Sequence, residues 1–132
     1  MAWYTVWIVL WDDVVEDSIF PNSVGSSHDS RIEWLHEQGL KYVQYELGLS
    51  GETEAVPPPT QICGLFKHCA DALRAECTIP ERQRLYNELK YYMDCCKAEQ
   101  KQIKSGALPS LDTYWDHRFG SSTVNTYSAL GE

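Results

Sequence analysis

The chain has 132 residues, 43% of them hydrophobic and 12% aromatic, which is typical of one folded domain rather than of a disordered polypeptide. Its 19 acidic residues outnumber the 11 Lys and Arg residues, and the formal net charge is −8. This balance argues against nucleic acid as a partner, because a phosphate backbone needs a basic face. No apolar run approaches the roughly 18–20 residues of a membrane span, so we expect none.

The cysteines and the start of the chain indicate a reducing compartment. The five cysteines include the adjacent pair Cys95 and Cys96, and the apolar N-terminus lacks a basic leader and runs directly into Asp12. An odd, adjacent set favours reduced thiols on helices over a disulfide framework. The absence of a Cys-x-x-Cys pair argues against zinc. We therefore expect a cytoplasmic protein.

Apolar residues recur at helical spacing along nearly the whole chain, and no stretch shows a convincing strand-like alternation. The sequence therefore predicts an all-α fold. The first helix is expected from about Trp3 to Asp17, and the helix breaker at Pro21 follows it.

An acidic motif, Asp-Asp-Val-Val-Glu, occupies residues 12–16 near the end of this helix. At about 100° per residue, Asp12 and Glu16 lie about 40° apart on the helix surface. The same side carries Thr5, Ile8 and Val9. The opposite side carries the large residues Trp3, Trp7, Trp11 and Val14. One face is therefore suited to packing, and the other runs from small apolar residues into paired carboxylates.

Cleavage of a diphosphate from an apolar substrate requires a face of this kind. Mg²⁺ is held by one or two carboxylates together with phosphate oxygens and water, and as a Lewis acid it stabilises the departing diphosphate. An apolar wall keeps water from the carbocation left behind. The alternative is a solvated helix end, the usual meaning of an acidic cluster. Four acidic residues lie at this end of the helix: Asp12, Asp13, Glu16 and Asp17. Without a cation they repel one another, and the negative end of the helix dipole also opposes them. They therefore favour a bound cation.

A second helix is expected after a loop at 22–28, with Ser30 as its N-cap and Glu33 completing a capping box. Its buried side is expected to hold Ile32, Leu35, Gly39, Val43 and Leu47. The Pro-rich stretch at about 50–59 is predicted to be a mobile surface linker.

Two further helices are expected after the linker. Thr60 can cap a third helix, whose inward side is expected to hold Ile62, Phe66, Cys69 and Leu73. Pro80 suits the first turn of a long fourth helix that runs to about Lys104, and Gly106 can end it. Its buried stripe is predicted to be Leu85, Leu89, Tyr92, Met93 and Cys96.

A fifth helix is expected to begin near Ser110 and to carry Tyr114 and Arg118, which are four residues apart and so share a face. The run Gly-Ser-Ser-Thr at 120–123 is expected to break this helix before it resumes toward Leu130. A guanidinium beside loosened backbone amides and hydroxyls suits a phosphate group. The alternative is an ordinary kink beside a surface arginine.

Two motifs therefore stand in order along the chain. Trp-Asp-Asp-Val-Val-Glu lies at 11–16 and Leu-Pro-Ser-Leu-Asp-x-Tyr-x-x-x-Arg-x-Gly-Ser-Ser at 108–122, with three helical stretches between them. This order resembles the middle of fungal-type class I sesquiterpene synthases over most of the chain. The resemblance implies that residues 1–132 form an incomplete α-helical bundle of the terpenoid synthase type. It also implies a terpene cyclase, which ionises and cyclises a prenyl diphosphate, expected to be farnesyl diphosphate.

The resemblance further implies roles for individual residues at the metal. In that family the first aspartate of the acidic motif, here Asp12, bridges two Mg²⁺ ions. The second, here Asp13, supports the site by pairing with arginine. The last acid of the motif, here Glu16, is a nearby metal or water partner.

The second motif implies residues that bind the substrate diphosphate. Arg118 corresponds to the catalytic arginine that senses the diphosphate, and Tyr114 lies on its face. Ser121 and Ser122 match positions whose backbone helps to drive ionisation, although relatives often have glycine where this chain has Ser122.

Departures from the family pattern leave alternatives open. The second metal motif of the family lies far beyond the sensor arginine, and we interpret the spacing match of Asn125, Ser128 and Glu132 as chance. The chain is therefore expected to be partial, and inactive by itself. A non-catalytic helical relative is the alternative from another class. A chain-elongating prenyltransferase is disfavoured, because no second aspartate-rich motif occurs.

Overall fold

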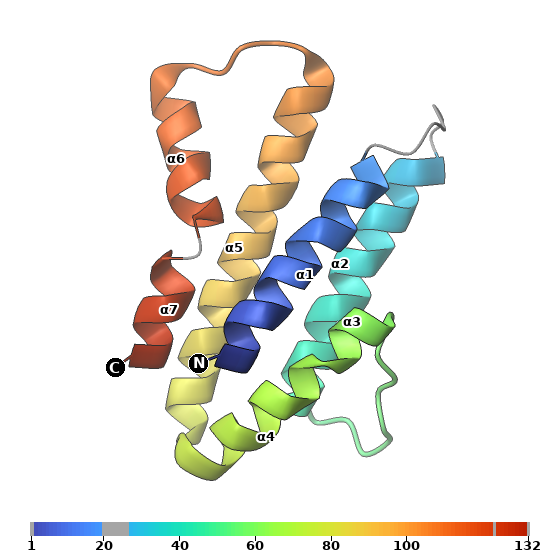
Figure 1. Ribbon diagram of the computed structural model, residues 1–132, viewed down its shortest axis with the longest axis vertical. Helices are drawn as coiled ribbons and strands as arrows, with labels where there is room; N and C mark the ends of the chain where they lie inside the picture. The colour runs from blue at the N-terminus through green and yellow to red at the C-terminus, as the bar shows by residue number, and fades with distance from the viewer. Residues whose placement is uncertain (1, 20–26, 123, 132) are drawn as a thin grey trace. The chain divides into compact units, whose positions relative to one another are not determined.

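The computed structural model describes the backbone of residues 2–19, 27–122 and 124–131, and the side chains of 4–13, 30–122, 124–126, 128 and 129. Within these ranges the chain is all-α and has no strand, as predicted (Figure 1). The helices are α1 (Ala2–Ile19), α2 (Ser27–Glu46), α3 (Gln61–Gly64), α4 (Phe66–Glu76), α5 (Ile79–Ser105), α6 (Leu111–Ser121) and α7 (Val124–Gly131). No helix in the described part of the chain is long and apolar enough to cross a membrane.

The chain divides into two compact units, Met1–Arg82 and Gln83–Glu132, with α5 beginning in the first and continuing in the second. No disulfide joins any of the five cysteines, so the expectation of reduced thiols is confirmed. Burial raises the pKa of the Cys63 and Cys95 thiols above its ordinary value, which favours the neutral form.

Aromatic residues of α1 form the centre of the first unit. Trp7 and Trp11 are buried with ring centroids 5.9 Å apart, and the ring of Trp7 lies 4.8 Å from that of Phe66 in α4. α1 packs against α2, α3 and α4. A Cβ on Gly39 of α2 would lie 2.7 Å from Cη2 of Trp11, so the missing side chain lets this ring approach the helix.

The buried face of α2 is the predicted one, but its start is not. Ser30 was expected to be the N-cap, whereas the helix begins at Ser27 and Ser30 lies within its first turns. A capping-box pattern also fits a helix interior when both side chains are exposed, as those of Ser30 and Glu33 are. The helix ends at Glu46, and Gly48 follows with φ +70°, in the left-handed region that glycine tolerates.

The stretch that joins α2 to α3 is free of helix and strand and largely exposed. Thr60 caps α3 as predicted, its Oγ1 accepting a hydrogen bond from the Cys63 amide at 3.1 Å. The structure has two helices, α3 and α4, where one was expected, because the backbone forms a tighter, 3₁₀-type turn at Leu65. The Leu65 amide donates to the Ile62 carbonyl, three residues back, at 3.1 Å.

Both ends of α5 agree with the prediction. The amide and hydroxyl of Thr78 each donate to Oε2 of Glu81 at 2.7 Å, which caps the first turn. Gly106 follows the last turn with φ +66°. The buried stripe contains Cys95, with an exposed fraction of 8%, rather than the predicted Cys96, which is only half-buried.

Candidate functional site

Helix α1 separates a packing face from an acidic face, as its sequence predicted. Trp7 and Trp11 are buried, whereas Asp12 and Asp13 are both exposed. Thr5 is exposed on the acidic side. Val9 is also exposed there, with an exposed fraction of 54%, and Ile8, which was predicted to lie on that side, is instead buried. The carboxylates are thus presented outward by a helix whose other face is fixed in an aromatic core.

The position of the acids within the helix differs from expectation. The helix was expected to end near Asp17, but α1 continues to Ile19. The dipole acts mainly within the last turn, so it opposes Glu16 and Asp17 more than Asp12 and Asp13. The side chains of Glu16 and Asp17 lie outside the described residues.

The donor set on α1 is compatible with Mg²⁺. No group of three or more His, Cys, Asp or Glu side chains gathers as a metal site in the part of the chain whose side chains are described. Mg²⁺ does not need one, because it is usually held by one or two carboxylates and takes its other oxygens from phosphate and water. Asp12 and Asp13 are two such exposed carboxylates.

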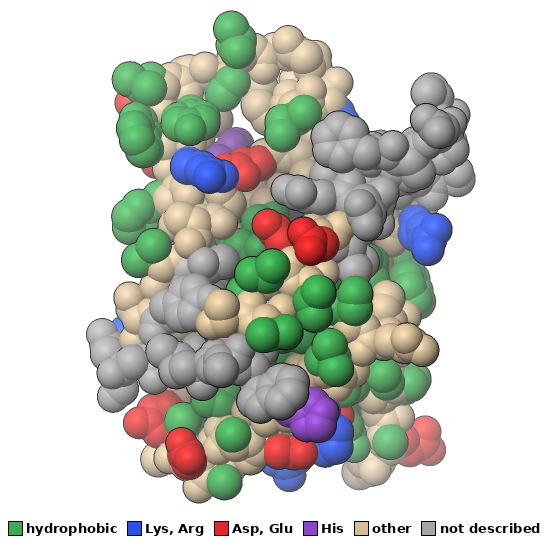
Figure 2. Space-filling model, viewed as in Figure 1, with side chains coloured by type: hydrophobic (Ala, Val, Ile, Leu, Met, Phe, Trp, Pro, Cys, Tyr) green, Lys and Arg blue, Asp and Glu red, His purple; other side chains and the backbone are tan. Residues whose placement is uncertain are grey.

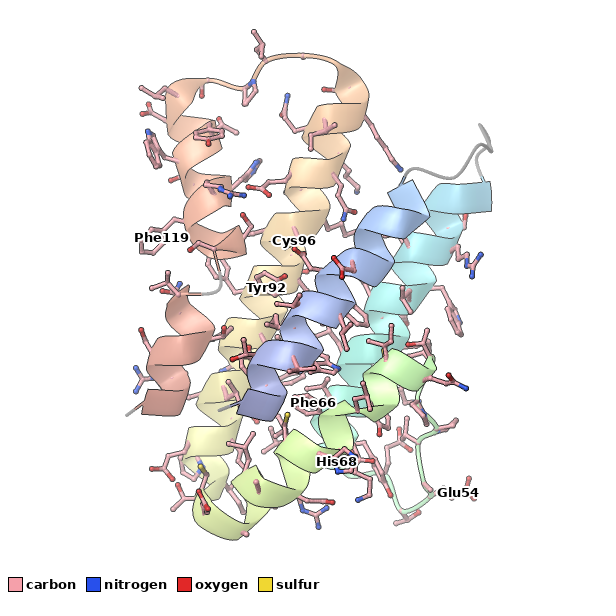
Figure 3. All side chains as sticks on the ribbon, viewed as in Figure 1. Glu54, Phe66, His68, Tyr92, Cys96 and Phe119 are labelled. Atoms are coloured by element: carbon pink, nitrogen blue, oxygen red, sulfur yellow. The ribbon has the colours of Figure 1, made fainter. Side chains whose placement is uncertain are left out.

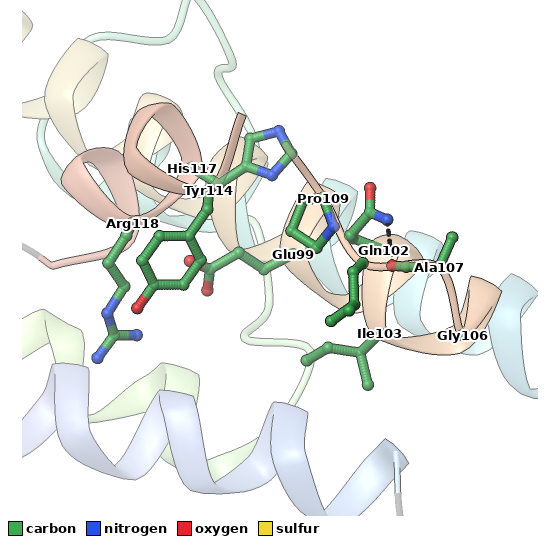
Figure 4. A pocket seen from close by; sticks show the side chains of 10 residues that line it. Glu99, Gln102, Ile103, Gly106, Ala107, Pro109, Tyr114, His117 and Arg118 are labelled. Atoms are coloured by element: carbon green, nitrogen blue, oxygen red, sulfur yellow. Dashed lines mark hydrogen bonds between the residues drawn. The ribbon is translucent and has the colours of Figure 1, made fainter. Parts of the chain in front are cut away.

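In the second unit, Tyr114 and Arg118 line a pocket of about 460 Å³. The pocket lies between the last turns of α5, the connection at 106–110, and α6 (Figure 4). Its lining comprises Glu99, Gln102, Ile103, Gly106, Ala107, Leu108, Pro109, Tyr114, His117 and Arg118. The structure therefore brings Tyr114 and Arg118 together at one cavity, as their spacing predicted.

The pocket combines an apolar wall with a guanidinium, from Arg118, and a carboxylate, from Glu99. Ile103, Leu108 and Pro109 supply the apolar part. In Figure 4 the ring of Tyr114 lies beside the Glu99 carboxylate, with Arg118 on the same side of the pocket.

Two hydrogen bonds hold the rim of this pocket. Gln102 Nε2 donates to the Ala107 carbonyl at 2.7 Å and holds the connection after α5. At the start of α6, Ser110 accepts a hydrogen bond from the Thr113 amide at 3.2 Å and so caps the helix that was expected to begin near it. The pocket wall is thus built from local caps as well as from side-chain packing.

Ser121 and Ser122 are not in a loosened segment directly after Arg118. α6 continues through Phe119 and Gly120 to Ser121, so amides there belong to the helix and the expected break is displaced toward residue 122. The Ser121 hydroxyl donates to Glu99 Oε1 at 2.7 Å, and that of Ser122 donates to the Phe119 carbonyl at 2.8 Å.

Gly120 lies inside α6, where this helix packs closely on Cys95 of α5. A Cβ at this position would overlap Sγ of Cys95 and lie 3.1 Å from Cε1 of Tyr91. The glycine is present for close helix packing, not to break the helix.

The residues that match the second metal motif by spacing lie in and beyond α7. Asn125 is half-buried and Ser128 is exposed, while Glu132 is outside the described residues. Sequence reasoning missed three polar residues of the pocket, Glu99, Gln102 and His117. Glu99 could not have been found from local spacing, because its partner Ser121 is 22 residues away on another helix.

An all-α chain with outward carboxylates on one helix and an arginine-lined pocket on another fits the metal-binding domain of terpene synthases. The model of the family described as "Terpene synthase family 2, C-terminal metal binding" matches residues 4–132. The chain belongs to this terpene synthase family, as the two motifs predicted, and the family is one that binds metal.

Among curated proteins, the chain is similar to "Sesquiterpene cyclase hepA" of Aspergillus oryzae (strain ATCC 42149 / RIB 40). The two are 26% identical over 136 residues, which cover 98% of this chain and 36% of the relative. The chain thus spans about a third of the length of that relative. No solved structure matches the chain closely enough to count as similar.

Proposed function

We propose that the protein acts in Mg²⁺-dependent ionisation and cyclisation of a prenyl diphosphate in the cytoplasm. The product would be a sesquiterpene, with release of diphosphate, and farnesyl diphosphate is the substrate we propose. One observation carries this proposal: a single family match covers both the acidic motif with Asp12 and the segment with Arg118. The similarity to a protein named as a sesquiterpene cyclase supports farnesyl diphosphate as the substrate.

The acidic face of α1 is the metal-holding part of this proposal. Asp12 and Glu16 would hold Mg²⁺, and Asp13 would support the site. When bound, Mg²⁺ supplies Lewis-acid stabilisation of the negative charge on the leaving diphosphate. The exposed Val9 beside these carboxylates offers apolar contact to a hydrocarbon substrate.

The pocket of the second unit is the diphosphate-binding part. The Arg118 guanidinium would donate two parallel hydrogen bonds to a phosphate group, a geometry that lysine cannot reproduce. Ser121 and Ser122 would contribute their backbone only if the end of α6 unwinds, since it is helical in this structure. The Tyr114 ring would stabilise a nearby carbocation by about 0.5–2 kcal/mol.

Substitution of the two aspartates tests the metal assignment. In a chain extended to the length of its relative, Asp12→Asn should nearly abolish turnover of farnesyl diphosphate, and in either chain it should raise the Mg²⁺ concentration needed for half-maximal diphosphate binding. Asp13→Asn should be milder, because Asp13 is about 100° from Asp12 around the helix. The measurements are product analysis by gas chromatography and calorimetric titration of diphosphate at several Mg²⁺ concentrations.

Unchanged Mg²⁺ dependence in both variants would refute the site. Absence of turnover by the parent, together with normal Mg²⁺-dependent diphosphate binding, would favour a non-catalytic relative over an enzyme.

A further inference from the structure

The last turn of α6 is fastened to α5 by two contacts within the second unit. The Ser121 hydroxyl donates to Oε1 of Glu99 at 2.7 Å, at a partly buried position. One residue earlier, buried Gly120 packs so closely on Cys95 that a Cβ would overlap the sulfur. The glycine sets how near the helices come. The hydrogen bond adds a directional contact, which sets how α6 is rotated about its axis.

This rotation determines where Arg118 points. Arg118 precedes Ser121 by three residues on the same helix, and the Ser121 hydroxyl lies 3.4 Å from the Arg118 carbonyl. A helix advances about 100° per residue, so a change in rotation at Ser121 carries Arg118 with it. Glu99 lines the same pocket as Tyr114 and Arg118 (Figure 4).

We propose that Glu99 is a positioning residue, which holds the Arg118 end of α6 through the Ser121 hydroxyl. This role rests on the proposed function, in which Arg118 binds diphosphate. A carboxylate is the stronger acceptor for this hydroxyl, because hydrogen bonds to ionised groups are shorter and stronger than neutral ones. Glu99 itself contributes a hydrogen-bond acceptor and makes no bond to metal or substrate.

The same substitution of Glu99 should have different effects if the residue is a hydrogen-bond acceptor for Ser121 and if it is a metal ligand. Glu99→Gln removes the charge but keeps a carbonyl oxygen that can accept from Ser121. Glu99→Ala removes both, and Ser121→Ala removes only the donor. If Glu99 acts through Ser121, the two alanine variants should behave alike, and their combination should be no worse than either alone. Glu88→Ala, on the same helix but away from the pocket, is the control.

The experiment measures two quantities on each variant. The first is hydrogen exchange of the backbone amides of residues 119–122 without any ligand, which reports whether the last turn of α6 is held. The second is the dissociation constant for inorganic diphosphate with Mg²⁺, measured by calorimetry. We expect Glu99→Ala and Ser121→Ala to accelerate exchange and to weaken diphosphate binding about tenfold. Glu99→Gln and Glu88→Ala should stay within about twofold of the parent.

The outcomes separate this inference from the proposed function. If Glu99→Gln weakens diphosphate binding as much as Glu99→Ala while exchange is unchanged, Glu99 is a ligand and the inference is wrong. It is equally wrong if Ser121→Ala leaves exchange and binding unchanged. If exchange follows the expected pattern but the parent binds no diphosphate, the proposed function fails, whereas the positioning of α6 by Glu99 stands.

Discussion

The aromatic side chains at the centre of the first unit and those on α6 of the second differ in exposure. In the first, Trp7, Trp11 and Phe66 are almost fully buried, whereas Trp115 and Phe119 of the second have exposed fractions of 59% and 62%. Phe119 projects outward from α6 (Figure 3), and hydrophobic side chains gather at the surface over that helix (Figure 2).

The difference shows two ways of positioning a candidate site. In the first unit, large buried rings fix α1, so its opposite face is free to carry carboxylates. In the second, α6 is held by a glycine contact and one hydrogen bond, Gly120 on Cys95 and Ser121 on Glu99. Loss of a buried ring in the first unit should therefore cost more stability than loss of an exposed ring on α6, and substitutions at the α5–α6 contact should act mainly on ligand binding.

The largest expected effect is loss of the Phe66 ring. Phe66→Ala should lower the free energy of unfolding by about 3–5 kcal/mol, because it removes a buried ring next to Trp7 and leaves a cavity. The matched variant in the second unit, Phe119→Ala, should change it by about 0.5 kcal/mol or less, since that ring is already in solvent. Urea unfolding followed by circular dichroism measures both. Similar losses of unfolding free energy in the two variants would contradict the proposed difference between these two rings.

A smaller effect is expected where α2 meets Trp11. Gly39→Ala should destabilise the protein by about 1–2 kcal/mol. The new Cβ forces the Trp11 ring to move, and the higher helix propensity of alanine offsets only part of that cost. Gly51→Ala, where a Cβ meets nothing within 4 Å, is the control. A Gly39→Ala protein at least as stable as the parent would mean that the ring has room.

The smallest expected effect is on the pH dependence of stability, through the Glu81 cap at the start of α5. Hydrogen bonds from Thr78 lower the pKa of Glu81 below its ordinary value. Because the folded-state pKa is the lower one, the capping contribution is present at neutral pH and is lost as the pH falls through this lowered pKa. Glu81→Gln should remove that part of the pH dependence of the melting temperature. Glu54→Gln, an exposed carboxylate before α3, should leave it unchanged, and equal pH profiles for all three proteins would contradict the cap.

Local patterns were enough to predict most of the fold. Capping by Thr60, the start of a helix near Ser110 and termination by Gly106 depend on short stretches of sequence, and all three were predicted correctly. The buried face of α2 and the exposed aspartates of α1 follow from helical periodicity alone. The gathering of Tyr114 and Arg118 at one pocket follows from their spacing of four residues.

Contacts between distant residues could not be predicted in the same way. Cys95 replaces Cys96 in the buried stripe because Gly120 packs on it from another helix. Gly120, where a helix break was expected, makes this same contact from within α6. Glu99 became part of the candidate site only through Ser121, and nothing near Glu99 in the sequence indicates that partner.

The measurement that tests the account most directly is diphosphate binding by Arg118→Lys. Calorimetric titration of inorganic diphosphate with Mg²⁺ should show at least about tenfold weaker binding than by the parent, because a charged hydrogen bond of the guanidinium is lost. Helical circular dichroism should be unchanged, and Arg31→Lys on α2 should bind like the parent. If Arg118 is only a surface residue on α6, the lysine variant will bind diphosphate as tightly as the parent. That result would contradict the assignment of this pocket to diphosphate.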